Sequence, residues 1–138
     1  MHHSHNYIVM FIIMILSGLL STMNIWVDKY SDIRLSINDL YMIMLMTGWM
    51  FLFMGLFYKE TRIIMIGIIL ISFNIWGIRT QFLVSEMQYK LSMIPHHSMA
   101  VHMSKKLLEK NNNIQSFLKN IINTQKNEIE IIKNTTKL

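Results

Sequence analysis

The segment YIVMFIIMILSGLLSTMNIWV, residues 7–27, contains no aspartate, glutamate, lysine or arginine. Its length matches the roughly 20 apolar residues that a helix needs to cross a hydrocarbon layer of about 30 Å. A second charge-free stretch follows at residues 40–58, and a third at residues 63–84 has Arg79 as its only charge. The sequence therefore predicts a region of three transmembrane helices over residues 1–85.

The composition agrees with an integral membrane protein. The chain has 138 residues, of which 52% are hydrophobic, and its mean hydropathy is +0.34. A small soluble core needs less apolar surface than this. The first apolar stretch lacks the basic start and the small-residue cleavage site of a secretory signal, so we expect it to remain as an anchor. With no cysteine present, the side chains left to bind a soft metal are imidazoles, thioethers and carboxylates.

Residues 86–138 are polar and rich in lysine, with apolar side chains at helical spacing. In the last segment the apolar positions recur at steps of three and four residues: Ile114, Phe117, Leu118, Ile121, Ile122, Ile129 and Ile132. The preceding segment offers a matching stripe: Met93, His96, Ala100, Met103 and Leu107. Asn111, Asn112 and Asn113 interrupt the pattern, as asparagines do at turns. The tail is therefore predicted to fold as an antiparallel helical hairpin domain over residues 86–138.

The hairpin predicts which residues meet. Both helices rise about 1.5 Å per residue, so residues whose numbers sum to about 224 lie at equal height. This register places His96 opposite Glu128 and Met99 opposite Gln125. Because a polar side chain in a packed interface needs a partner, these residues are expected to form one cluster with His97. Pro95 is expected to kink the first helix or to restart it.

Two other clusters are interpreted as structural. The loop between the first two predicted spans contains aspartates whose spacing fits no calcium loop, and we expect them to cap helices or to be solvated: Asp28, Asp32 and Asp39. The N-terminus carries three histidines that we interpret as a flexible polar lead or tag remnant rather than a metal site: His2, His3 and His5.

The hairpin motifs resemble a known family. The first helix reads Glu86-x-x-Tyr89-x-x-x-Met93-Ile94-Pro95-His96-His97-x-x-Ala100, and the second reads Ile121-Ile122-x-x-Gln125-x-x-Glu128-Ile129. In this order and spacing they closely resemble the domain of unknown function 305 family. The preceding part is similar to the membrane-anchored branch of that family, with Asp28-Lys29-Tyr30 in the loop and Tyr41-Met42-x-x-Leu45-Met46-Thr47 in the second span.

The resemblance implies a ferritin-like helical domain, and some secreted members of the family are implicated in copper binding and tolerance. It implies that His96, His97, Gln125 and Glu128 occupy the motif positions here, with Glu86 as a further acidic candidate. Two positions depart from the pattern. Glu86 stands where the family often has Asp, and Trp49 stands where some relatives have Pro.

The chemistry of the cluster favours copper. Imidazole binds both oxidation states, and thioethers select the soft monovalent ion. His96, Met99 and Met103 fall on one helix face at steps of three and seven residues. The candidate metal ligands are therefore His96, His97, Met93, Met99, Met103, Glu128, Gln125 and Glu86. The alternative is a structural or interaction module, in which histidine–glutamate and histidine–glutamine pairs only lock the hairpin and its basic face contacts lipid or a second subunit.

No catalytic residues emerge from the sequence. It contains no nucleophile–base pair, phosphate-cradling glycine loop or thiol motif, which favours a protein that is not an enzyme. A di-iron oxidase of the ferritin type needs about twice the carboxylates of one hairpin, so it would require a homo-oligomer.

The expected partners are the lipid bilayer, a metal ion and a second copy of the chain. Nucleic acid is disfavoured because no aromatic residues interleave the tail lysines. The distribution of basic residues favours a cytoplasmic tail.

Overall fold

The computed structural model describes residues 6–136, so the N-terminal histidines His2, His3 and His5 lie outside the described residues. Within this range the fold is all-α, as the sequence predicts, with no strand. Its elements are the helices α1 (Tyr7–Leu20), α2 (Ile37–Tyr58), α3 (Thr61–Thr80), α4 (Glu86–Leu108) and α5 (Gln115–Thr136), with two short 3-10 helices, η1 (Met23–Trp26) and η2 (Tyr30–Asp32).

The chain forms two compact units, each built from two separate segments. One unit comprises residues 1–21 and 38–83, and the other comprises residues 22–37 and 84–138. We expected two domains divided at residue 85. The structure assigns the loop between α1 and α2 to the unit of the C-terminal hairpin, which the expected division did not include. The two units are described separately below.

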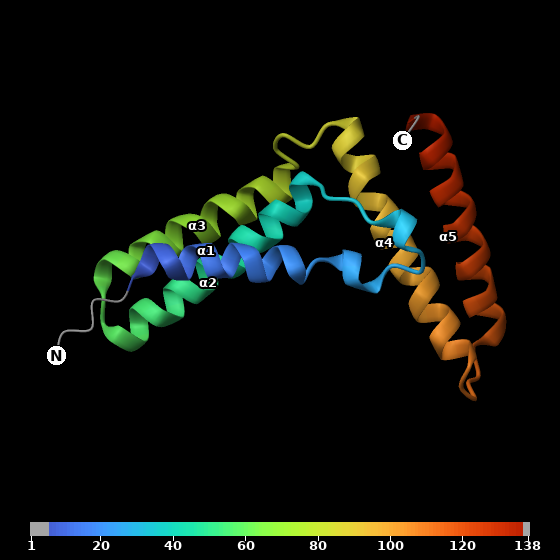
Figure 1. Ribbon diagram of the computed structural model, residues 1–138, viewed down its shortest axis with the longest axis horizontal. Helices are drawn as coiled ribbons and strands as arrows, with labels where there is room; N and C mark the ends of the chain where they lie inside the picture. Colours follow the sequence, from blue (N-terminus) through green and yellow to red (C-terminus); the bar gives the residue numbers. More distant parts are fainter. Residues whose placement is uncertain (1–5, 137–138) are drawn as a thin grey trace. The chain divides into compact units, whose positions relative to one another are not determined.

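The first unit contains α1, α2 and α3, shown from blue to green in Figure 1. Three segments are long and apolar enough to cross a membrane: Tyr7–Trp26, Ile37–Tyr58 and Thr61–Thr80. Most of their large apolar side chains are exposed in the chain alone, which is compatible with a lipid environment.

Glycines allow α2 and α3 to approach each other closely. A Cβ added at Gly67 of α3 would lie 2.6 Å from the backbone nitrogen of Leu52 and 2.9 Å from the backbone oxygen of Gly48, both in α2. Small residues at such crossings are typical of helices that associate within a membrane, where backbone approach and van der Waals packing drive association. Near the end of α3, the Tyr41 hydroxyl donates a hydrogen bond of 2.6 Å to the Phe82 carbonyl.

The second unit contains an antiparallel hairpin of α4 and α5, with η1 and η2 packed against α4. Figure 1 shows the two helices running in opposite directions from one short turn. Ser85 caps the start of α4 by accepting a hydrogen bond from the Gln88 backbone nitrogen. In the turn, the Asn112 amide donates to the carbonyls of Leu107 and Lys110, and its oxygen accepts from the Ile114 nitrogen. The asparagine turn expected from the sequence is therefore present.

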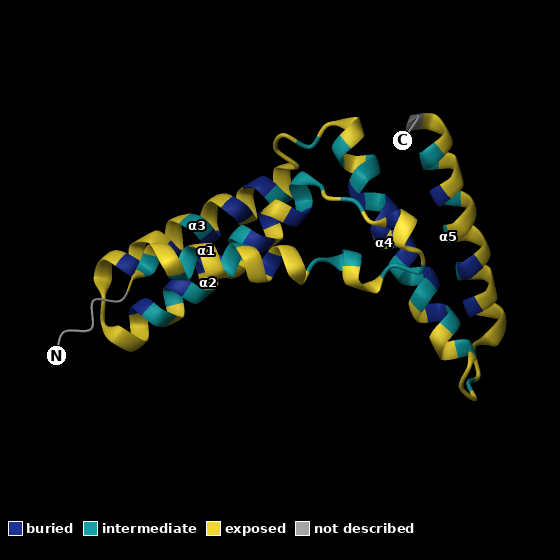
Figure 2. Cartoon of the chain, viewed as in Figure 1, coloured by how far each residue is buried: buried dark blue, intermediate teal, exposed yellow. Residues whose placement is uncertain are grey.

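The hairpin core is a small apolar set on facing sides of the two helices (Figure 2). It comprises Ile94, Val101, Leu118, Ile122 and Ile129. The apolar stripe predicted for α5 supplies its part of this core. The stripe predicted for α4 is wrong, because His96, Met103 and Leu107 are exposed, whereas the buried α4 residues include several serines: Ser92, Ser98 and Ser104.

Pro95 does not restart the helix. Helix α4 is continuous from Glu86 to Leu108, with Pro95 inside it and fully buried. A proline removes one backbone donor and crowds the preceding turn. Here its apolar ring is part of the hairpin unit's interior.

Candidate functional site

A histidine and a glutamate bridge the two helices of the hairpin. The Nδ1 atom of His97 on α4 lies 3.2 Å from the Oε2 atom of Glu128 on α5. Their numbers sum to 225, so the predicted register of the hairpin is accurate to one residue. The predicted partner was His96, which is exposed instead. One residue turns a helix by about 100°, and the α4 face that packs on α5 is the one that carries His97.

Gln125 belongs to the same cluster, through Glu128. Its side-chain nitrogen donates a hydrogen bond of 3.2 Å to the Oε2 atom of Glu128, one turn away on α5. We expected Gln125 to face Met99 across the hairpin, but the contact it makes is within its own helix. The amide fixes the position of the carboxylate that faces His97.

The imidazole of His97 is buried without a hydrogen bond at Nδ1. The side chain has 10% of its surface exposed, and Nδ1 makes no hydrogen bond of suitable geometry despite its proximity to Glu128. Burial lowers the pKa of His97, Glu128 opposes this effect, and the neighbouring His96 adds to it. A neutral imidazole with a free ring nitrogen is the form that binds a metal ion.

Helical spacing relates the methionines of α4 to the two histidines. Met93 lies one turn before both, four residues from His97 and three from His96. Met99 and Met103 share the face of His96, and Met103 is half exposed. Among the described residues, no three histidine or acidic side chains are close enough to hold a metal ion. A donor set at His97 therefore consists of one imidazole, one carboxylate and, from the same face, one thioether.

Glu86 is not placed with this cluster. It is the first residue of α4 and forms an ion pair of 2.5 Å with Lys90. Eleven residues of helix, or about 16 Å, separate it from His97. His102 lies further along α4, in a groove with Met103 and Trp26.

The depressed pKa of His97 predicts a pH dependence. The folded hairpin prefers the neutral imidazole, whereas the unfolded chain takes up a proton near the usual value of 6.5. Its contribution to stability is thus complete above that pH and is lost as the pH falls through the window between the usual value and the lower folded-state pKa. Unfolding of wild type and His97→Gln, measured from pH 7.5 to about 5, should show a stability difference that changes across this window. A constant difference would contradict the prediction.

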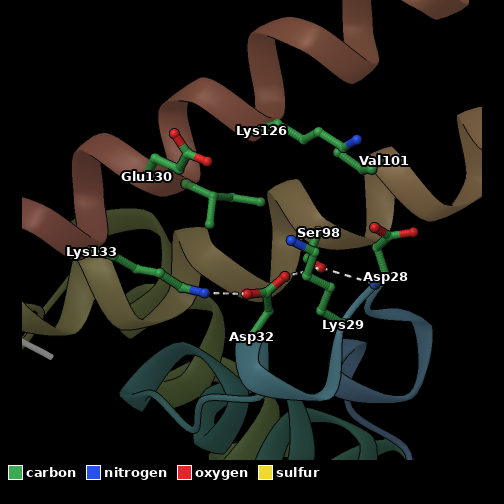
Figure 3. Close-up of a pocket in the computed structure, with 9 residues that line it drawn as sticks. Asp28, Lys29, Asp32, Ser98, Val101, Lys126, Glu130 and Lys133 are labelled. Carbon is green, nitrogen blue, oxygen red and sulfur yellow. Dashed lines mark hydrogen bonds and ion pairs between the residues drawn. The ribbon is translucent and has the colours of Figure 1, made fainter.

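The hairpin unit also contains a polar cavity that was not expected from the sequence. It has a volume of about 330 Å³ and is lined by Asp28, Lys29, Asp32, Ser98, Val101, Lys126, Ile129, Glu130 and Lys133. Figure 3 shows that three elements contribute to this cavity: the loop that precedes α2, helix α4 and helix α5. We name it the loop cavity.

Two aspartates anchor the loop to the hairpin. Asp32 is 3% exposed, accepts a hydrogen bond of 2.6 Å from Ser98 and forms an ion pair with Lys133. The backbone nitrogen of Asp28 donates to the Ser98 hydroxyl at 2.9 Å, and its carboxylate pairs with Lys105 at 2.6 Å. Our interpretation of Asp28 and Asp32 as capping or solvated residues is therefore wrong.

Helical periodicity carries no signal for these contacts, because they join residues that are 66 to 101 positions apart. In the sequence, this loop was singled out only by the resemblance of Asp28-Lys29-Tyr30 to a motif of the family.

The comparisons with known proteins agree with the hairpin motifs. The model of the family described as domain of unknown function (DUF305) matches residues 81–136. The chain is also 41% identical over 130 residues to "Uncharacterized protein L153" of Acanthamoeba polyphaga mimivirus, a match that covers 88% of this chain and 85% of the relative. Residues 81–136 are a DUF305 domain, and the chain belongs to one family with this viral protein. The family match covers α4 and α5, and the match to the viral protein extends well into the apolar helices of this DUF305 protein. No solved structure matches the chain.

Proposed function

We propose that this DUF305 protein is an integral membrane protein whose hairpin unit binds a monovalent copper ion at His97. The membrane part is supported by the three apolar segments. Along the sequence, two of them, α2 and α3, come between the loop of residues 22–37 and the hairpin. Two crossings return the chain to the side on which it started, so loop and hairpin share one side. The contacts of Asp28 and Asp32 with α4 and α5 require this.

Membrane integration predicts behaviour that can be measured directly. The full chain should stay in the membrane pellet after alkaline carbonate extraction, because apolar helices are held by the hydrocarbon core. In sealed vesicles, a protease should reach the loop after α1 and the end of α5 from the same side. Extraction of the chain into the carbonate supernatant, or cleavage of the two segments from opposite sides, would contradict it.

The observation that supports a metal ion is the buried, unbonded ring nitrogen of His97 opposite a carboxylate. In tetrahedral zinc sites, for example, nitrogen and oxygen ligands bind at about 2.0–2.2 Å and therefore lie about 3.3–3.5 Å apart. The separation of 3.2 Å between Nδ1 of His97 and Oε2 of Glu128 is close to this value. This separation supports the assignment of the two atoms as ligands of one metal ion.

The kind of metal follows from the donors on the same face. Met93 would add a thioether to the imidazole, and thioethers select monovalent copper over harder ions. Gln125 would act on the carboxylate rather than on the metal, because its amide already donates to Glu128. Such supporting hydrogen bonds orient the ligands of metal sites.

A structural role for the same residues is the second candidate, because the contacts of His97, Glu128 and Gln125 already connect α4 to α5. In that case the cluster would lock the hairpin and no metal would bind. The two candidate functions predict different effects on copper affinity when His96 or His97 is substituted.

Titration with cuprous ion under anaerobic conditions, against a competing chelator, distinguishes them. The full chain in detergent should bind copper, and His97→Ala should lower the affinity at least about tenfold. His96→Ala is the matched control, since it removes an exposed imidazole next in the chain, and should retain the affinity of the wild type. Equal affinities for all three proteins, or no binding by the wild type, would contradict the proposal and favour the lock.

A further inference from the structure

Three lysines and three acidic residues line the loop cavity, but one of these acids is paired with a lysine that does not line it. Asp28 is held by Lys105 through both carboxylate oxygens, at 2.6 and 2.7 Å, and Asp32 is paired with Lys133. The charged lining residues that remain are Lys29, Lys126 and Glu130. Within the part of the chain that the structure describes, the side chains of these three make no hydrogen bond or ion pair. Two lysines thus face one glutamate.

Glu130 does not neutralise Lys126 although it lies one turn further along α5. Figure 3 shows the Lys126 ammonium directed towards Val101 of α4, away from the Glu130 carboxylate. A lysine that precedes a glutamate by four residues is also the less favourable order for an ion pair on a helix. Lys126 is therefore available to a ligand in the cavity.

We propose that the loop cavity binds a phosphate group between Lys29 and Lys126. Lysine is a common ligand of phosphate, which it binds as a compact point charge. The volume of about 330 Å³ leaves room for a phosphate and part of its hydration. This site is distinct from the copper site proposed at His97.

A phosphate bound between the two lysines would also link the loop to the hairpin. Lys29 belongs to the loop that precedes α2, and Lys126 belongs to α5. A phosphate between them would add a third link from this loop to the hairpin, beside the Asp28–Lys105 and Asp32–Lys133 pairs. The phosphate can come from a free solute or from the headgroup of an anionic phospholipid, and the test separates the two sources.

The test uses the full chain in nanodiscs and two double variants of equal charge. Lys29→Ala/Lys126→Ala removes the cavity lysines, and Lys110→Ala/Lys119→Ala removes two exposed lysines that do not line the cavity. In nanodiscs of zwitterionic lipid, calorimetric titration with inorganic phosphate should show saturable binding. The cavity variant should weaken it by about tenfold or more, and the control variant should stay close to the wild type.

In nanodiscs of mixed lipid, native mass spectrometry measures retained anionic phospholipid. Binding of inorganic phosphate that depends on the cavity lysines indicates a free solute, and retention of lipid with the same dependence indicates a headgroup. Either result supports the proposal. It is overturned if the wild type binds neither, or if both double variants lose binding equally. All four lysines are exposed, so the variants should fold, which circular dichroism checks.

Discussion

Replacement of Lys133 by alanine is expected to destabilise the hairpin unit by about 3–5 kcal/mol. The carboxylate of Asp32 is buried and its charge partner is Lys133, so the variant leaves a buried charge without compensation. Because part of the Lys133 side chain reaches solvent, we expect the lower end of this range. Hydrogen exchange of α4 and α5 amides in the full chain should accelerate at least about a hundredfold, at about 1.4 kcal/mol per factor of ten.

Two further variants test the cause. Lys119→Ala removes an exposed lysine from the same helix and should change exchange little. Asp32→Asn/Lys133→Met removes both charges, keeps an acceptor for the Ser98 hydroxyl and should recover most of the stability, since apolar replacement of a buried ion pair is often tolerated. If Lys133→Ala behaves like Lys119→Ala, then Asp32 is not held by this pair.

Replacement of Gly67 by valine is expected to separate α2 from α3. The new Cβ would meet backbone atoms of Leu52 and Gly48 at less than 3 Å, and backbone cannot move aside as a flexible side chain can. Overpacking typically costs about 1–3 kcal/mol, and we expect at least the upper end because the two helices must shift. Unfolding of the full chain by sodium dodecyl sulfate in mixed micelles measures this loss.

The matched control is Ser72→Val, which adds the same side chain at an exposed position of α3. It should leave the unfolding curve close to that of the wild type, because Ser72 is exposed. Similar curves for Gly67→Val and Ser72→Val would show that the close approach of α2 and α3 contributes little to stability.

The hairpin was predictable because its information is local and periodic. Apolar residues at steps of three and four identified α5, and Asn112 at the break identified the turn. The rise of the helix then gave the register to one residue. The rotation of α4 was not predictable in this way, because its buried face contains serines, which a hydrophobic stripe does not reveal. That error assigned Glu128 to His96 instead of His97.

The order of amino acids was thus sufficient for three apolar helices long enough to span a membrane, an asparagine turn, a helical hairpin and the DUF305 motifs. Each of these depends on segment length, spacing or a short motif. The attachment of the loop to the hairpin emerged from the folded chain. It rests on Asp28 and Asp32, whose partners Ser98, Lys105 and Lys133 are distant in sequence and occupy no periodic pattern. The sequence around a charged loop residue does not identify its partner. Folding buries the charge, and a buried charge is stable only when it is paired.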